Sequence, residues 1–322
     1  MKKNRGLLGG GVLLSILICL GSMSGCSFLG FGSRDDYNGF STPRVKSAFR
    51  KQIARSQDEA TAFKKLPEMT SEDYENSGDM YFGNGEFYMA FVQYEKALGL
   101  KPDNVRVMYK KGILFLFTDK YEDAAKEFQV LIKKAPDHAS AYEGLGQALF
   151  QMRKYNEAEN SLMKALELEP KLWKARNFLG NIFDYRKKYD AAQKMYSDAI
   201  MINPHEISLY NNLGVSLSLA GKYESSIKAY MHALGINGPK AKVYNNLGMV
   251  LAKTGQNDAA LEAFKKGTDS ARGNNNLGCA LMAKGEFNEA AGYFRKAIEL
   301  SPKFYVKAND NLKKISLKDS IH

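Results

Sequence analysis

Small and apolar positions recur along most of this chain with a period of 34 residues, beginning near residue 71. Each repeat has a glycine, a small residue twelve positions later, and a larger apolar or aromatic residue four positions after that. The glycines are Gly78, Gly112, Gly146, Gly180, Gly214, Gly248 and, after a shorter interval, Gly278. The small residues are Ala90, Ala124, Ala158, Ala192, Ser226, Ala260 and Ala290. The larger residues are Tyr94, Phe128, Leu162, Tyr196, Tyr230, Phe264 and Phe294. A spacing of four places two side chains on one helix face, so the pattern predicts two short helices per repeat.

Proline marks the end of most repeats. It stands at Pro102, Pro136, Pro170, Pro204 and Pro302, moves by one position to Pro239 in the fifth repeat, and is lost from the shorter sixth. Because proline cannot continue the helical hydrogen-bond ladder, it ends the second helix of a repeat. Glycine and alanine let two helices approach closely, and the larger residue fills the space beside that contact. We therefore expect an all-α fold of stacked helical hairpins.

A repeat of this length with these positions resembles the tetratricopeptide family. The resemblance implies a right-handed superhelical solenoid of about seven hairpins, at residues 71–104, 105–138, 139–172, 173–206, 207–240, 241–270 and 271–304. Since one hairpin cannot bury its apolar face alone, the terminal hairpins need polar caps. Residues 303–322 are expected to supply a C-terminal capping helix, with Phe304, Val306, Ala308, Leu312 and Ile315 at helical spacing.

The first 25 residues have the character of an export signal. Three basic residues precede an apolar run from Leu7 to Leu20, and small residues then lead to Cys26. The run is too short for a comfortable transmembrane helix. Gly25-Cys26 resembles the lipobox of bacterial lipoproteins, which implies that Cys26 is acylated and becomes the new N-terminus. Ser27 resembles the class sorted to the outer membrane, facing the periplasm. An ordinary secretory cleavage and an uncleaved anchor are the alternatives.

Two segments separate Cys26 from the repeats. Residues 26–43 are rich in Gly and Ser and should form a flexible tether. Residues 44–70 are predicted to contain a flanking helix, in which five basic residues surround an apolar stripe: Arg44, Lys46, Arg50, Lys51 and Arg55. One hypothesis is that this helix lies on anionic lipid headgroups. The other is that it packs on the first repeat.

Net charge and cysteine content limit the kinds of partner and site that the chain can have. The net charge is +11, and a basic surplus favours anionic lipid or an acidic partner. The export signal makes nucleic acid a poor candidate. Cys19 lies in the export signal and Cys26 in the lipobox, so Cys279 is the single thiol left and is expected to be buried. The four histidines are scattered, and we find no catalytic constellation, metal site or cofactor-binding motif.

Asparagines are concentrated in the first helices of the later repeats, at Asn177, Asn181, Asn211, Asn212, Asn245, Asn246, Asn275 and Asn276. In the tetratricopeptide family such positions line a concave groove. Asparagine is a poor helix former, so its repeated use needs a reason. The motif Asn-Asn-Leu-Gly resembles the asparagine ladder of O-linked N-acetylglucosamine transferases, which holds peptide backbone. This predicts a peptide-binding row; the alternative is that the amides bond to neighbouring helices and fix the stacking.

Earlier repeats carry apolar residues at the same positions: Ile113, Leu116, Phe117, Phe150 and Tyr185. These indicate an apolar pocket for a helix or a hydrophobic side chain, or else ordinary packing.

Lipobox, tandem repeats and repeated Asn-Asn-Leu-Gly together resemble the accessory lipoproteins of tight-adherence (Flp-type) pilus assembly, and less closely the pilotins of type IV pili. That resemblance implies a non-enzymatic scaffold whose partners are secretin or pilus subunits. An adaptor that recruits cell-wall enzymes is the alternative.

Overall fold

The structure is a computed structural model that describes residues 69–301 and 305–319. The predicted export signal, the lipidated Cys26 and the tether lie outside these residues, as does nearly all of the flanking helix. Every regular element in the described part is a helix, which confirms the all-α fold.

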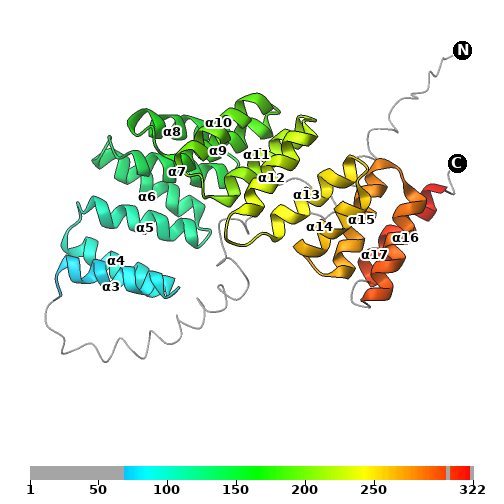
Figure 1. The fold of residues 1–322 in the computed structure, drawn as a ribbon. Coiled ribbons are helices and arrows are strands. Elements are labelled where there is room, and N and C mark those ends of the chain that lie inside the picture. The colour runs from blue at the N-terminus through cyan, green and yellow to red at the C-terminus, as the bar shows by residue number, and fades with distance from the viewer. Residues whose placement is uncertain (1–68, 302–304, 320–322) are drawn as a thin grey trace, which may run out of the picture. The chain divides into compact units, whose positions relative to one another are not determined.

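The helices follow one another as hairpins joined by short turns (Figure 1). The first helices are α3 (Ser71–Gly83), α5 (Val105–Phe117), α7 (Ala139–Gln151), α9 (Trp173–Tyr185), α11 (Ile207–Leu219), α13 (Ala241–Lys253) and α15 (Ser270–Lys284). The second helices are α4 (Phe87–Leu100), α6 (Tyr121–Lys134), α8 (Tyr155–Leu168), α10 (Tyr189–Ile202), α12 (Tyr223–Gly235), α14 (Asn257–Gly267) and α16 (Phe287–Leu300). A last helix, α17 (Tyr305–Asp319), follows α16.

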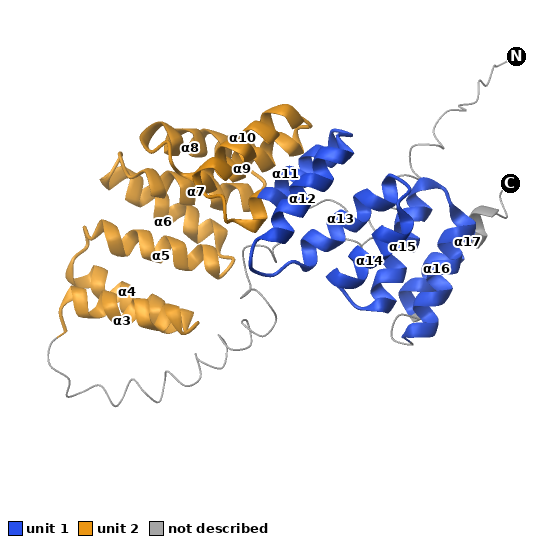
Figure 2. Ribbon diagram, in the orientation of Figure 1, with its two compact units in different colours: residues 1–30, 210–322 blue, residues 31–209 orange. Residues whose placement is uncertain are grey.

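The chain divides into two compact units between Leu209 and Tyr210 (Figure 2). In unit 2, α3 to α10 form four hairpins, and each hairpin packs on the next along the chain. Its core is continuous from α5 to α9 and contains Phe128, Leu162 and Phe178. In unit 1, α13 to α17 pack in the same sequential manner.

The recurring glycines lie where the sequence pattern predicts them, against the large residue of the second helix. A Cβ atom added at Gly78 would lie 2.4 Å from the ring of Tyr94, and one at Gly248 would lie 2.7 Å from the ring of Phe264. All seven large residues at this position are buried. The close helix contact therefore depends on the missing side chain of the glycine, and the ring fills the space beside it.

A left-handed residue ends the turn within each hairpin. Four of these residues are glycines, Gly85, Gly221, Gly255 and Gly285, with φ between 75° and 87°. The other three are Asp119, Arg153 and Lys187, with φ near 60°. A side chain in this region of φ costs about 1–2 kcal/mol, and the cost is smaller for Asp than for Arg or Lys.

Glycine at Lys187 is therefore expected to stabilise the protein. We predict that Lys187→Gly and Arg153→Gly each raise the free energy of unfolding by about 0.5–1 kcal/mol, after the greater freedom of glycine in the unfolded chain is subtracted. Urea denaturation would measure the change. Gly221→Lys, the reverse exchange at the equivalent turn, should lower stability by a similar amount; equal stability of all three variants with the parent would contradict the argument.

The two ends of the stack differ from its middle. Positions three and ten of a first helix, counted from residues 71, 105, 139, 173, 207, 241 and 271, are buried in the last six repeats. In α3 they are Asp73, which is exposed, and Met80, which is 56% exposed. In the last described helix, α17, Leu312 stands at position eight, where the repeats have glycine.

Helix α17 lies within residues 303–322, where a capping helix is predicted, and it packs mainly on α16. Ala308 and Ile315 are buried, as their spacing suggests. Val306 is 66% exposed, so its assignment to the apolar face was wrong. It lies in the first turn of α17, before the helix comes against its neighbours. Phe304 lies outside the described residues.

Candidate functional site

Within each unit, the candidate site is the face at positions 2, 5, 6, 9, 12 and 13 of the first helices, counted from the same starting residues. We call these positions the first-helix face. In unit 2, α5 contacts α7 and α7 contacts α9, so residues of this face come from adjacent helices. Position five is occupied in turn by Glu75, Tyr109, Glu143, Asn177, Asn211, Asn245 and Asn275.

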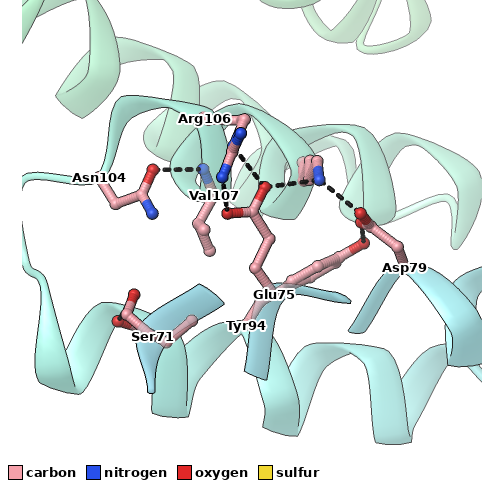
Figure 3. A network of polar contacts seen from close by, with 9 residues as sticks. Ser71, Glu75, Asp79, Tyr94, Asn104, Arg106 and Val107 are labelled. Atoms are coloured by element: carbon pink, nitrogen blue, oxygen red, sulfur yellow. Dashed lines mark hydrogen bonds and ion pairs between the residues drawn. The ribbon is translucent and has the colours of Figure 1, made fainter. Parts of the chain in front are cut away.

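Glu75 joins the first two repeats through charged contacts. Its carboxylate accepts hydrogen bonds from Arg106 (2.8 Å) and Lys110 (2.6 Å), which stand at positions two and six of the next first helix (Figure 3). Lys110 also donates to Asp79 (2.5 Å), and Asp79 accepts from the hydroxyl of Tyr94 (2.8 Å). The glutamate itself is 1% exposed, so both cations are needed to compensate its burial.

The charges around Glu75 and Tyr94 shift the pKa values of both side chains. Burial alone would raise the pKa of the Glu75 carboxyl, but the hydrogen bonds from Lys110 and Arg106 outweigh it and lower the pKa. Burial and the neighbouring Asp79 raise the pKa of Tyr94. Since the folded pKa of Glu75 lies below its unfolded value, its contribution to stability is present at neutral pH. It is lost as the pH falls through the folded pKa.

In unit 1, position five carries asparagine, and its side-chain amide accepts a hydrogen bond from the next first helix. Asn246 donates through Nδ2 to Oδ1 of Asn211 (2.8 Å), and Asn276 donates to Oδ1 of Asn245 (3.5 Å). The series continues into the capping helix, where Nδ2 of Asn311 lies 3.5 Å from Oδ1 of Asn275. Position five therefore supplies an acceptor oxygen to the first helix that follows. Glu75 does the same with a carboxylate.

Two asparagines of the row lie in unit 2 and are buried. Oδ1 of Asn181 accepts a hydrogen bond from the hydroxyl of Tyr196 (2.7 Å), which also donates to Asp184 (2.9 Å). Asn177 is buried as well. Of the eight predicted peptide-binding asparagines, Asn212 and Asn245 are partly exposed, and the other six are buried.

These contacts favour the stacking role for the asparagines that bond between helices. Peptide binding by the row stays a prediction, and it concerns above all Asn212 and Asn245, whose side chains are more accessible. Cys279 is confirmed as a buried thiol, and its sulfur lies 3.5 Å from Nδ2 of Asn311.

A double-mutant cycle would measure the stacking contribution directly. We expect Asn211→Ala and Asn246→Ala to be coupled by about 1 kcal/mol in the free energy of unfolding, because each single variant leaves a buried amide without its partner. As a control, Asn246→Ala should be uncoupled from Arg295→Ala, an exposed position on α16. A coupling energy no larger than that of the control pair would contradict a role of the Asn211–Asn246 hydrogen bond in helix stacking.

The predicted apolar pocket residues divide into two groups. Leu116 and Phe150 are buried in the core of unit 2, and Ile113 packs against it, as the packing alternative predicts. Phe117 is partly exposed and meets the ring of Phe82 edge-on, with centroids 5.1 Å apart. Tyr185 is 54% exposed, with its ring centroid 4.3 Å from that of Tyr155. The pocket stays a prediction for these exposed rings.

Comparison with known protein families covers most of the described helices. Models of the tetratricopeptide repeat match residues 74–104, 109–170, 144–207, 205–273 and 271–304. These ranges together make up well over half of the chain. The chain belongs to the tetratricopeptide-repeat family.

Individual tetratricopeptide relatives share shorter stretches or lower identity. Superkiller complex protein 3 of Homo sapiens is 30% identical over 79 residues, which are 24% of this chain and 5% of the human protein. The match thus spans a small fraction of that relative. Among solved structures, a tetratricopeptide repeat protein from Parabacteroides merdae has a TM-score of 0.56 at 16% identity, over 76% of this chain and 98% of its own. PilF of Pseudomonas aeruginosa has a TM-score of 0.54 at 18% identity, over 77% and 97%. Identities this low show a shared fold alone.

Membership of the tetratricopeptide family indicates a scaffold for protein–protein interaction, a class that is typically non-enzymatic. Within residues 69–301 and 305–319, no group of three or more His, Cys, Asp and Glu is arranged to hold a metal ion. Nor does any helix of that part have the length and apolar character to cross a membrane.

At position five of the first-helix face, the sequence analysis missed three residues: Glu75, Tyr109 and Glu143. The search followed a residue type, asparagine, which starts only at the fourth repeat. Following position five through every repeat would have found all three, since the 34-residue register places them in line with Asn177 and Asn211.

Proposed function

We propose that this chain is a membrane-anchored protein-binding scaffold that assists the assembly of a pilus or secretion complex in the cell envelope. The observation that carries the proposal is the combination of a lipobox at Cys26 with tandem tetratricopeptide hairpins in one chain. The hairpins supply a surface for protein partners, and the acyl chains hold that surface at a bilayer. We propose the outer membrane, facing the periplasm, because Ser27 follows the cysteine.

The anchor is supported by simple energetics. Each buried CH₂ of an acyl chain contributes about 0.8 kcal/mol to membrane binding, and stable anchoring requires two signals. Multiple acyl chains on Cys26 satisfy that requirement. The basic residues from Arg44 to Arg55 add attraction to anionic lipid. The other hypothesis, that this segment packs on the first repeat, would leave the anchoring to the acyl chains alone.

The anchor can be tested with the full chain in a diderm bacterium. Labelling with an alkyne-tagged fatty acid should modify the parent chain, and fractionation should recover it with outer-membrane markers. Cys26→Ser should abolish the label and release the protein to the soluble periplasm. An unlabelled parent chain, or unchanged membrane association of Cys26→Ser, would refute the lipid anchor.

The partner is tested by capture from solubilised envelopes followed by identification of the bound proteins. Recovery of secretin, prepilin or secretion-ATPase components supports the assembly role. Recovery of peptidoglycan hydrolases or synthases instead would favour the adaptor of cell-wall enzymes and reject the assembly role.

A further inference from the structure

Glu143 differs from Glu75 although both occupy position five. Glu75 is bound by the cations at positions two and six of the next first helix, Arg106 and Lys110. For Glu143, position six of the next first helix is Phe178, and position two is Lys174. Among the described residues neither Glu143 nor Lys174 forms an ion pair; the ammonium of Lys174 lies 5.7 Å from the ring centroid of Trp173. Glu143 therefore has one neighbouring cation, Lys174, with which it forms no ion pair, and it has none at position six, where Glu75 meets Lys110.

One polar contact holds the Glu143 side chain. Its Oε1 accepts a hydrogen bond from the backbone N–H of Ala175 (3.0 Å), in the first turn of α9. A carboxylate can accept about four hydrogen bonds, so most of its capacity is left over. Burial raises the pKa of the Glu143 carboxyl, despite the lowering influence of Lys174 and of the Ala175 N–H, whereas the pKa of Glu75 is lowered.

Helix α5, which contacts α7, brings an aromatic and an aliphatic side chain to the first-helix face. Tyr109, at position five of the preceding repeat, is partly buried and stacks on the ring of His138, with centroids 5.3 Å apart. Burial, and then the charge of Glu143, raise the pKa of Tyr109 to about 12. Ile113 lies one turn further along α5 and packs on the core of unit 2. The first-helix face thus carries the Glu143 carboxyl on α7, and Tyr109 and Ile113 on the contacting helix α5.

We propose that Glu143 is the anchor for a basic side chain, lysine or arginine, of a bound polypeptide. The incoming cation takes the place that Arg106 and Lys110 occupy at Glu75, and Tyr109 packs against the aliphatic stem of the basic residue. Because the carboxylate is already partly desolvated, a cation is favoured there over a neutral or acidic side chain. This inference rests on the proposed scaffold function and gives its ligand a chemistry: a polypeptide with a basic residue.

The test uses the full chain in detergent and three capped pentapeptides, Ac-Ala-Ala-X-Ala-Ala-NH₂, with lysine, norleucine or glutamate at X. Trp173 is the sole tryptophan, and it precedes Lys174 and Ala175, so its fluorescence reports on this site. We expect the lysine peptide to bind at least about tenfold more tightly than the norleucine peptide, with the glutamate peptide weakest. Equal affinities, or no saturable change with the lysine peptide, would overturn the proposal.

Glu143→Gln supplies the decisive variant, with Glu157→Gln, an exposed carboxylate on α8, as the matched control. The amide oxygen introduced by E143Q can still accept from the N–H of Ala175, so the fold is expected to persist with unchanged or raised stability at neutral pH. E143Q should lose the preference for lysine over norleucine, and E157Q should keep it. A preference retained in E143Q would assign the recognition elsewhere.

A pH series separates this role from a structural one. Lysine binding should strengthen as the pH rises through the pKa of Glu143 and then level off, and E143Q should show no such rise. The other titratable groups that influence the carboxylate are Lys174 on α9, Glu169 at the C-terminal end of α8 and Tyr109 on α5, whose ring stacks on that of His138. Failure of the peptide tests, with envelope partners still captured, would reject the Glu143 anchor and leave the scaffold function intact.

Discussion

Replacing Gly180 by leucine is expected to cost about 3 kcal/mol of unfolding free energy, because it combines overpacking with the loss of buried hydrogen bonds. A Cβ atom at this position would lie 2.5 Å from the ring of Tyr196. That ring is completely buried, and its one hydroxyl proton is shared between the acceptor oxygens of Asn181 (2.7 Å) and Asp184 (2.9 Å). The side chain cannot move aside without giving up this hydrogen bonding.

The effect should reach the first-helix face as well as the core, since Asn181 and Asp184 stand at positions nine and twelve of that face. Urea denaturation would measure the change in stability. Capture of partner proteins would show whether the first-helix face still binds them. Gly99→Leu is the matched control, because nothing lies within 4 Å of a Cβ atom at that exposed position. Leucine is the better helix former, so Gly99→Leu should keep or gain stability. Equal losses in the two variants would show that the contact with Tyr196 does not determine the result.

Replacing Phe128 by alanine should cost about 3–5 kcal/mol, the range found when a large aromatic side chain is removed from a packed core. The ring is wedged between two glycines: a Cβ atom would lie 2.6 Å from it at Gly112 and 2.4 Å from it at Gly144. Gly112 is in the same hairpin as Phe128, and Gly144 is in the next. One side chain therefore stabilises both a hairpin and the interface to its neighbour.

Because each repeat contacts only its neighbours, weakening this interface should also reduce cooperativity. We expect the urea m-value of Phe128→Ala to fall, with the hairpins before α7 unfolding first. Val130→Ala, an exposed position two residues further along α6, should change stability by less than about 0.5 kcal/mol. A two-state transition of unchanged m-value in Phe128→Ala would show that the interface is not a separate source of stability.

Much of this fold could be predicted from the sequence because every repeat uses the same helix contact, with residues of the same size at the same positions. Gly78 and Tyr94 by themselves would be a weak signal. Their counterparts in six further repeats make the pairing of helices plain. The prediction failed for Val306, in a helix outside the repeat pattern, because the helical spacing alone did not show on which side neighbours would lie.

The site was less predictable, because residue type and repeat position carry different information. Asparagines at Asn211 and Asn246 suggested a ligand, and the structure pairs them with each other across two helices. Glu75 and Glu143 are indistinguishable by position. Their environments differ because the residue at position six of the next first helix is Lys110 for Glu75 and Phe178 for Glu143. That difference becomes meaningful only once the neighbours in space are known.

Modules that stack on copies of themselves carry a hazard, since a stack with identical chemistry at both ends would add further molecules without limit and grow into a fibre. Among the described helices, α3 carries the exposed Asp73 where later repeats bury an uncharged residue, and α17 carries Leu312 where the repeats have glycine. These two helices therefore do not repeat the chemistry of the inner hairpins, which disfavours head-to-tail addition of further copies through them.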